Sequence, residues 1–91
     1  MAWATRLSDN CTGHGPCRPR RSCSGSPNVF TNNLAQMRLS DCYVRHCNHG
    51  GILVTGSTTV FVNSLPAGRQ FDNVNCGSMA NDHSPDVDIG G

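Results

Sequence analysis

The feature that most constrains this sequence is an internal repeat. Residues 25–41, GSPNVFTNNLAQMRLSD, align without a gap with residues 56–72, GSTTVFVNSLPAGRQFD. Gly, Ser, Val-Phe, Asn, Leu, Arg and Asp fall in the same columns of the two copies. The segment HSPDVDIGG, residues 83–91, is similar to the beginning of both and is interpreted as a third, truncated copy. Self-similarity on this length scale indicates repeated supersecondary units that pack against one another.

Each copy predicts a β-hairpin. Its first strand is a β-branched and aromatic run, Val-Phe-Thr at 29–31 and Val-Phe-Val at 60–62, and such runs favour strands. Asn-Asn or Asn-Ser follows at once, and Asn tolerates the left-handed backbone that a tight hairpin requires. A short returning strand then ends at Asp41 or Asp72. The predicted fold class is therefore all-β, with three hairpin repeats that can pack in a pseudo-threefold arrangement.

The composition agrees with a β-rich chain that has little core. All seven cations are Arg and all six anions are Asp, while nine Asn, ten Gly and five Pro favour turns over helices. The 91 residues, of which 36% are hydrophobic, predict a single domain over 1–91. Domains of this size usually add a metal, disulfides or a partner, and six Cys and four His are available here.

Charge and hydropathy argue against several classes of protein. A net charge of +1 is too small for nucleic-acid or membrane-surface binding through bulk electrostatics. No run approaches the ~20 apolar residues of a membrane span, and no apolar signal segment follows Met1. We therefore expect a soluble protein made in a cytoplasm, where cysteines bind metal or fill space more often than they form disulfides. A disulfide-stapled exported domain is the alternative, and a free-thiol count distinguishes the two.

The loops between the copies carry candidate metal ligands at repeated positions. His49 and Cys76 each lie eight residues before the Ser of the copy that follows. His14 lies twelve residues before its Ser, as expected if its Arg-rich loop contains a four-residue insertion. His46 joins from the middle loop, five residues after the Asp that closes the first complete copy. The repeated spacing favours a metal site over three unrelated loop histidines.

Three His and one Cys make the closed tetrahedral set that structural zinc prefers. Nitrogen and sulfur ligands also favour zinc over magnesium or calcium. Cys47, next to His46, is an alternative fourth ligand. Four protein ligands leave no position for an activated water, so a zinc hydrolase is not predicted.

Two further classes of protein are disfavoured by the same residues. The chain has neither a Cys-x2-Cys pair nor a His-x3–5-His pair, so a zinc-binding nucleic-acid module is the weaker alternative. Nothing in the sequence fixes a general base or an oxyanion hole around Cys76. We therefore expect no catalytic residues, no small-molecule substrate and no enzyme.

Taken together, these motifs resemble the PAAR-repeat family, named for a Pro-Ala-Ala-Arg stretch after a Val-Phe-x-Asn hairpin. The second copy has Pro66-Ala67-Gly68-Arg69, and the first copy keeps only Ala35 and Arg38 in register. Asp-x-Cys-Thr-Gly-His-Gly, Gly-Ser-Pro-Asn-Val-Phe, His-Cys-x-His-Gly-Gly and Asn-Cys-Gly occur in order along nearly the whole chain. The opening Asp-x-Cys-Thr-Gly-His and the middle His-Cys are most similar to the phage baseplate branch of the family.

The resemblance implies a conical spike-tip domain with zinc, less often iron, near its apex. The family's ligands are three His and one Cys, which map onto His14, His46, His49 and Cys76. The broad base would cap a trimeric β-helical spike, one cap per trimer, in a contractile phage tail, so the expected location is the virion. The tip would touch the host envelope transiently as the spike pierces it. The tip of a bacterial type VI secretion spike is the alternative, disfavoured because the sequence stops after the third copy with no toxin attached.

Some positions depart from the family pattern. The third copy has Asp86 and Asp88 where Asn and Phe are usual, so its strand is expected to pack less well. Gly often precedes the Asp of each copy, and here Ser8, Ser40 and Phe71 replace it.

Two groups of residues allow two interpretations each. An apolar group is expected to form core rather than to bind the spike, and comprises Val29, Phe30, Val60, Phe61 and Val62. A basic group is expected to be a solvated loop, with phosphate or lipid contact as the alternative, and comprises Arg18, Arg20 and Arg21. The residues that bind the partner therefore stay unassigned.

Overall fold

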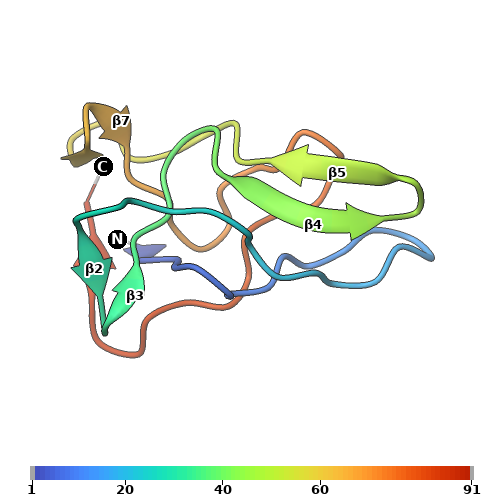
Figure 1. Cartoon of the computed structure of the whole chain (residues 1–91), viewed down its shortest axis with the longest axis horizontal. Coiled ribbons are helices and arrows are strands. Elements are labelled where there is room, and N and C mark those ends of the chain that lie inside the picture. The colour runs from blue at the N-terminus through green and yellow to red at the C-terminus, as the bar shows by residue number, and fades with distance from the viewer. Residues whose placement is uncertain (1, 91) are drawn as a thin grey trace.

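The computed structural model describes residues 2–90, and in this range it contains strands and turns but no helix (Figure 1). Accordingly, no helix of these residues is long and apolar enough to cross a membrane. The strands form four antiparallel two-stranded sheets: β1 (Ala2–Trp3) with β8 (Asp88–Ile89), β2 (Phe30–Thr31) with β3 (Leu34–Ala35), β4 (Cys42–His46) with β5 (His49–Ile52), and β6 (Phe61–Val62) with β7 (Leu65–Pro66). The prediction of an all-β fold is confirmed.

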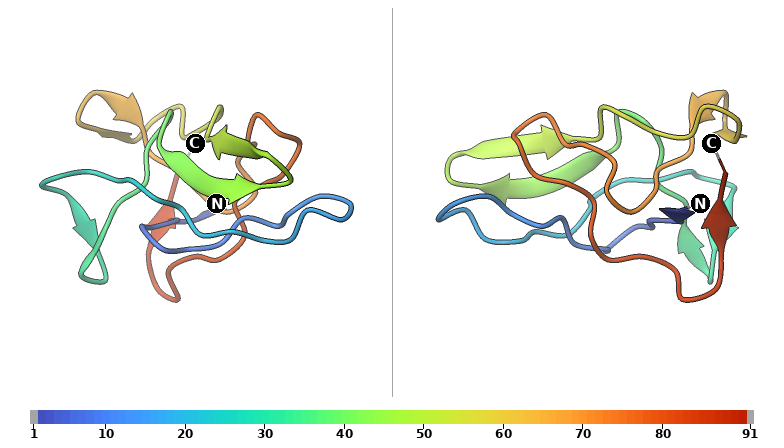
Figure 2. Two further views of the ribbon diagram at one scale, coloured as in Figure 1. Left: turned by 45° about the vertical axis from the view of Figure 1, so that its right-hand side comes forward. Right: turned by 180° about the vertical axis from the view of Figure 1, so that it is seen from behind.

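The sheets are divided between the two ends of an elongated molecule of 32 × 23 × 23 Å. The three smallest sheets lie together at one end, which we call the base, while β4 and β5 extend toward the other, which we call the apex (Figures 1 and 2). The chain segment between residues 10 and 21 runs beside β4 and β5 to the apex. The wide end is thus built from hairpins and the far end from one hairpin and loops.

The third repeat is complete, because the N-terminus supplies its second half. Asp88 pairs with Trp3 across β8 and β1, as Phe30 pairs with Ala35 and Phe61 with Pro66. The interpretation of a truncated copy is therefore corrected: residues 83–90 followed by 2–9 form one hairpin unit split between the two chain ends.

A ring of backbone hydrogen bonds joins the three repeats. Thr5 N–H donates to Gly68 O (3.2 Å), Gly68 N–H to Met37 O (2.8 Å), and Met37 N–H to Thr5 O (3.1 Å). The Gln36 side chain closes the centre of this ring, since its Nε2 lies 3.1, 2.9 and 3.2 Å from the oxygens of Thr5, Met37 and Gly68. The equivalent positions hold Ala4 and Ala67, which leave room for one side chain on the axis. The pseudo-threefold arrangement is confirmed.

Each repeat ends with the same Arg–Asp pair, at the point where the chain runs from the base toward the apex. Arg6 with Asp9, Arg38 with Asp41 and Arg69 with Asp72 are bridged at 2.8, 3.0 and 3.0 Å. Each Asp also accepts the backbone N–H of its Arg at 2.8 Å. The residue before each Asp has φ of +75°, +77° or +72°, which explains why Gly is usual at a place now held by Ser8, Ser40 and Phe71.

The Ser that begins each repeat is a buried turn cap. Ser26, Ser57 and Ser84 are 2, 1 and 0% exposed. Each Oγ accepts the N–H of the Val three residues later, at 2.9, 2.9 and 3.0 Å. The repeated Ser therefore has a structural reason, because it satisfies backbone donors that the short strands leave free.

Two small apolar clusters form the core. The larger comprises Cys11, Met37, Tyr43, Leu53, Val74 and Ala80, and the smaller Ala4, Val62, Ala67 and Ile89. The expectation that the Val-Phe runs form core is correct for Val62, which is 7% exposed, and wrong for the other four. Phe30 and Phe61 are 60 and 57% exposed, and Val29 and Val60 are 38 and 36% exposed. In β2 and β6 the second residue of the strand is buried, so Phe30 and Phe61 point outward. Val29 and Val60 lie just before these strands, where no pleat buries them.

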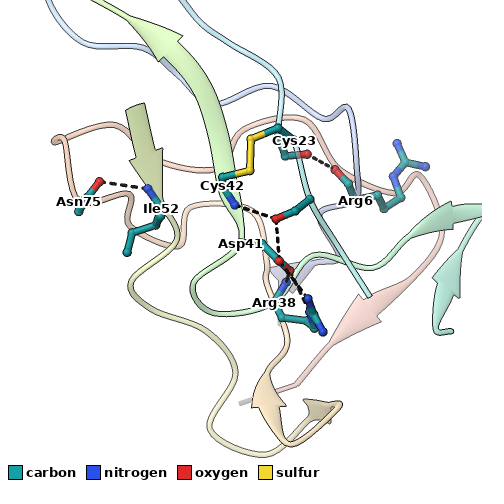
Figure 3. The surroundings of a disulfide bond; sticks show 9 residues. Arg6, Cys23, Arg38, Asp41, Cys42, Ile52 and Asn75 are labelled. Atoms are coloured by element: carbon teal, nitrogen blue, oxygen red, sulfur yellow. Dashed lines mark hydrogen bonds and ion pairs between the residues drawn. A yellow bond between two sulfur atoms is a disulfide. The ribbon is translucent and has the colours of Figure 1, made fainter. Parts of the chain in front are cut away.

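Four of the six cysteines form disulfides, so the expectation of reduced cysteines is wrong for them. Cys23 bonds to Cys42 at the start of β4, with a Cα–Cα distance of 5.2 Å. Figure 3 shows this bond beside Asp41 and Arg38, where the Cys42 N–H donates to the Ser24 hydroxyl and that hydroxyl donates to Asp41. The second disulfide joins Cys17 to Cys47 near the apex. Disulfides and a His–Cys cluster thus occur in the same small domain.

Candidate metal centre

The tip of the β4–β5 hairpin places two histidines side by side. His46 ends β4, His49 begins β5, and the two are register partners. The two turn residues, Cys47 and Asn48, have φ of +46° and +63°, the left-handed pair that a tight two-residue hairpin turn requires. Directly paired residues point to the same face of a hairpin, so this turn brings both imidazoles to one side.

A second turn carries His14. Its N–H donates to Cys17 O and its carbonyl accepts the Cys17 N–H, both at 2.8 Å. Gly13, with φ of +73°, precedes it, and a Cβ there would lie 2.5 Å from Cys17 O, so no other residue fits without moving the turn. The Gly13 N–H donates to Ser78 Oγ at 2.9 Å, which ties this turn to the loop that carries Cys76.

Cys76 reaches the centre because its loop packs against β5. Ile52 N–H donates to the Asn75 side chain, and Asn75 N–H donates to Ile52 O (Figure 3). A Cβ on Gly51 would lie 2.7 Å from Val74 Cγ1 and 3.6 Å from Cys76 Sγ. The absence of a side chain at Gly51 is therefore what lets this loop approach the hairpin.

The donor atoms of His14, His46, His49 and Cys76 all lie within 4.8 Å of one another. His14 Nε2 and His49 Nε2 are 3.1 Å apart, and Cys76 Sγ and His46 Nε2 are 3.8 Å apart. Tetrahedral zinc with nitrogen and sulfur ligands separates neighbouring donors by roughly 3.3–3.6 Å. The four side chains therefore fit one metal ion with small adjustments, and the set could hold a metal.

Two features prepare these imidazoles to act as ligands. His46 Nδ1 lies 2.6 Å from the carbonyl oxygen of Arg18, so this nitrogen is the one that carries the hydrogen and Nε2 keeps a lone pair directed at the cluster. Desolvation, followed by the nearby His46 and His49, lowers the pKa of His14. A lowered pKa favours the neutral imidazole, which is the form that binds metals.

The structure brings together the four residues predicted as ligands and leaves out the predicted alternative. Cys47 Sγ is bonded to Cys17, with a Cα–Cα distance of 5.5 Å, so Cys47 is not part of the cluster. Sequence reasoning missed this cross-link. The sequence nevertheless indicates it, because Cys17 follows His14 closely and Cys47 adjoins His46. If His14 and His46 bind one metal, the two cysteines also lie close together.

The sequence matches the PAAR motif family over residues 12–80. It is also similar to double-stranded DNA deaminase toxin A of Burkholderia cenocepacia (strain H111), with 36% identity over 66 residues. That match covers 70% of this chain and 5% of the toxin. The chain thus spans about a twentieth of the length of this relative.

Proposed function

The chain belongs to the PAAR motif family of spike-tip proteins, and we propose that it caps and sharpens the tip of a trimeric β-helical spike in a contractile phage tail. One cap would sit on each trimer, with its base on the blunt end of the spike and its apex toward the host envelope. The observation that carries this proposal is the division of the molecule into a pseudo-threefold base and a cross-linked apex.

The exposed apolar residues of the base match a threefold partner. Val29, Val60 and Val87 hold equivalent places in the three hairpins and are 38, 36 and 36% exposed. Phe30 and Phe61, which are 60 and 57% exposed, add large apolar side chains in two of the three hairpins. Apolar side chains repeated around an axis and left in solvent are typical of an interface with a symmetric partner.

Binding to a spike trimer tests this assignment of the base. The double variant Phe30→Asp, Phe61→Asp is expected to lose co-purification with a trimeric β-helical spike fragment, because it places charges in an apolar interface. Ile52→Asp and Val54→Asp, at exposed apolar positions outside the base hairpins, are the matched controls. If the base variant bound the trimer as tightly as the wild-type chain, the proposed docking face would be wrong.

At the apex, we propose that His14, His46, His49 and Cys76 bind one zinc ion. The ion would supply a structural cross-link between three loops and no chemistry, since four protein ligands leave no position for a reactive water. Elemental analysis should give about one zinc per chain, in preference to iron, and a free-thiol count on the denatured, metal-free protein should give two. A chain without metal, or one in which Cys76 is paired and no free thiol is found, would overturn the ligand set.

A second candidate is a spike tip of a bacterial type VI secretion system, which the likeness to a bacterial toxin favours. Mass spectrometry of purified phage particles and of secreted fractions separates the two sources. The similarity covers only 5% of the toxin, so deaminase activity is not proposed for this chain. The family and the closed donor set support a structural, non-enzymatic role.

A further inference from the structure

The charged residues of this molecule are divided into a paired set and an unpaired set. Three arginines form the Arg–Asp pairs of the base. The other four have no ion-pair partner among residues 2–90, and they are Arg18, Arg20, Arg21 and Arg45. All four lie in the loop or the hairpin that lead to the apex. The small net charge of +1 therefore hides a local excess of positive charge at one end.

Three of these arginines line a single hollow of about 520 Å³. Arg18, Arg20 and Arg45 share its wall with Pro16, Cys17, His46, Cys47 and Asn48. Arg21 is exposed and lies in the same loop, but outside the lining. We call Arg18, Arg20 and Arg45 the apical arginine patch.

The backbone under this patch is anchored on several sides. The carbonyl of Arg20 accepts the Cys11 N–H at 2.9 Å, and the carbonyl of Arg21 accepts the Val44 N–H at 2.9 Å. The Arg18 carbonyl lies 2.6 Å from His46 Nδ1, and the Cys17–Cys47 disulfide joins the two walls of the hollow. The guanidinium groups are therefore carried on a fixed frame, which lowers the entropy lost when they bind a ligand.

The unpaired carboxylates lie elsewhere. Asp88 is in β8 at the base, Asp86 accepts from Asn32 in the β2–β3 turn, and Asp82 accepts the Asn10 N–H. None of them lines the hollow. No acidic side chain of the described residues thus neutralises the patch.

We propose that the apical arginine patch binds the phosphate groups of anionic lipids. Guanidinium groups bind phosphate oxygens through paired N–H donors, and each Arg held near an anionic lipid surface contributes measurably to binding. Nucleic acid fits less well, because the patch is confined to one hollow, and a strand-binding groove needs an extended basic track with aromatic side chains. The proposal rests on the proposed function, since only the leading end of a spike would meet a lipid surface first.

Vesicle co-sedimentation tests the proposal with a matched pair of variants. The metal-loaded full chain is mixed with vesicles of phosphatidylglycerol and phosphatidylcholine, or with phosphatidylcholine alone. We expect Arg20→Gln to weaken binding to the anionic vesicles about fivefold, and the triple change R18Q, R20Q, R45Q to weaken it on the order of a hundredfold. Arg21→Gln, which removes the same charge from the same loop outside the hollow, should change it less than twofold.

Several results would overturn the proposal. Equal losses for Arg20→Gln and Arg21→Gln would show attraction by net charge alone, and equal binding to both vesicle types would remove the role of phosphate. Tighter binding to a DNA duplex than to anionic vesicles would assign the patch to nucleic acid instead. Zinc content and spike binding are measured on the same variants: if both persist while the vesicle result is negative, this proposal fails and the proposed function stands.

Discussion

The apex and the base of this molecule are held together by different means. At the base, three kinds of stabilising contact are repeated in each unit: a backbone bond of the central ring, an Arg–Asp pair and a buried Ser cap. At the apex, four donor atoms and the Cys17–Cys47 disulfide each occur once. The base is therefore stable through repetition in the peptide chain itself, whereas the apex depends on groups that chelation or reduction can remove.

The largest effect that separates the two ends is expected from loss of the metal. His49→Ala, or chelation of the wild-type chain, should free the loops around His14 and Cys76, because structural zinc contributes on the order of 10 kcal/mol to small domains. Hydrogen exchange should rise strongly at residues 12–17 and 74–78. The ring amides of Thr5, Met37 and Gly68 should stay protected.

The matched control for this variant is His83→Ala, because His83 lies outside the donor cluster. It should leave metal content and apical exchange unchanged. Full apical protection after complete metal removal would contradict the division between the two ends. It would mean that the disulfides alone hold the tip.

The next largest effect is expected at the centre of the base. Gln36 is 2% exposed, shares its amide hydrogens among three carbonyls and accepts from the Thr31 hydroxyl at 2.6 Å. Gln36→Leu removes these bonds and leaves the buried Thr31 hydroxyl without its acceptor, so it should lower the free energy of unfolding by about 3 kcal/mol. Chemical denaturation measures the change. Gln70→Leu, at a half-buried position without a side-chain bond to the described residues, is the control and should cost less than about 1 kcal/mol. Equal costs at the two positions would show that the Gln36 side chain does not stabilise the ring of backbone hydrogen bonds.

The sequence predicts the repeated part of this fold better than the parts that occur once. The Val-Phe-x-Asn pattern predicted the β-hairpins, because equivalent positions carry the same residues. The repeated spacing indicated His14, His49 and Cys76 as members of the cluster, and the distance from Asp41 indicated His46. The split third repeat was missed, although Arg-Leu-Ser-Asp occurs at both 6–9 and 38–41. A copy divided between the chain ends does not align as one continuous segment.

Other features were missed for physical reasons. Gln36 could not be foreseen at the centre of the ring, since a side chain on a threefold axis breaks the pattern of its own repeat. The disulfides were missed because the expected reducing compartment decided the expectation. The predicted ligands indicated that Cys17 and Cys47 lie close together, whereas nothing in the sequence indicates that Cys23 lies close to Cys42. The exposure of Phe30 and Phe61 was missed because a two-residue strand gives no period from which to tell its two faces apart.

A smaller effect concerns the Arg–Asp pairs and pH. Burial raises the pKa of Asp41, but the bonds from Arg38 and from Ser24 outweigh it and hold that pKa below its ordinary value. A carboxyl group with a lowered folded-state pKa stabilises the fold fully above the unfolded-state pKa, near 4, and loses this contribution as the pH falls through the folded-state value.

Asp41→Asn should therefore cost about 1–2 kcal/mol at pH 7 and progressively less in acid. Urea denaturation from pH 7 to pH 2.5, on both proteins, measures the difference. A difference that is constant with pH would contradict this role of the pair.

The smallest effect concerns a difference between the repeats of the base, which is the side chain at the positive-φ position before each Asp. Phe71 has φ of +72° and is 62% exposed, so its ring contributes little packing while its Cβ disfavours the left-handed backbone. Phe71→Gly should therefore raise the free energy of unfolding by about 1 kcal/mol. Gln70→Gly, one residue earlier and outside the positive-φ set, should instead lower it by roughly 0.5–1 kcal/mol, and differential scanning calorimetry resolves the two signs. If both changes were destabilising, the Phe71 side chain would be stabilising the second repeat by packing, and the strain argument for the position before each Asp would not hold.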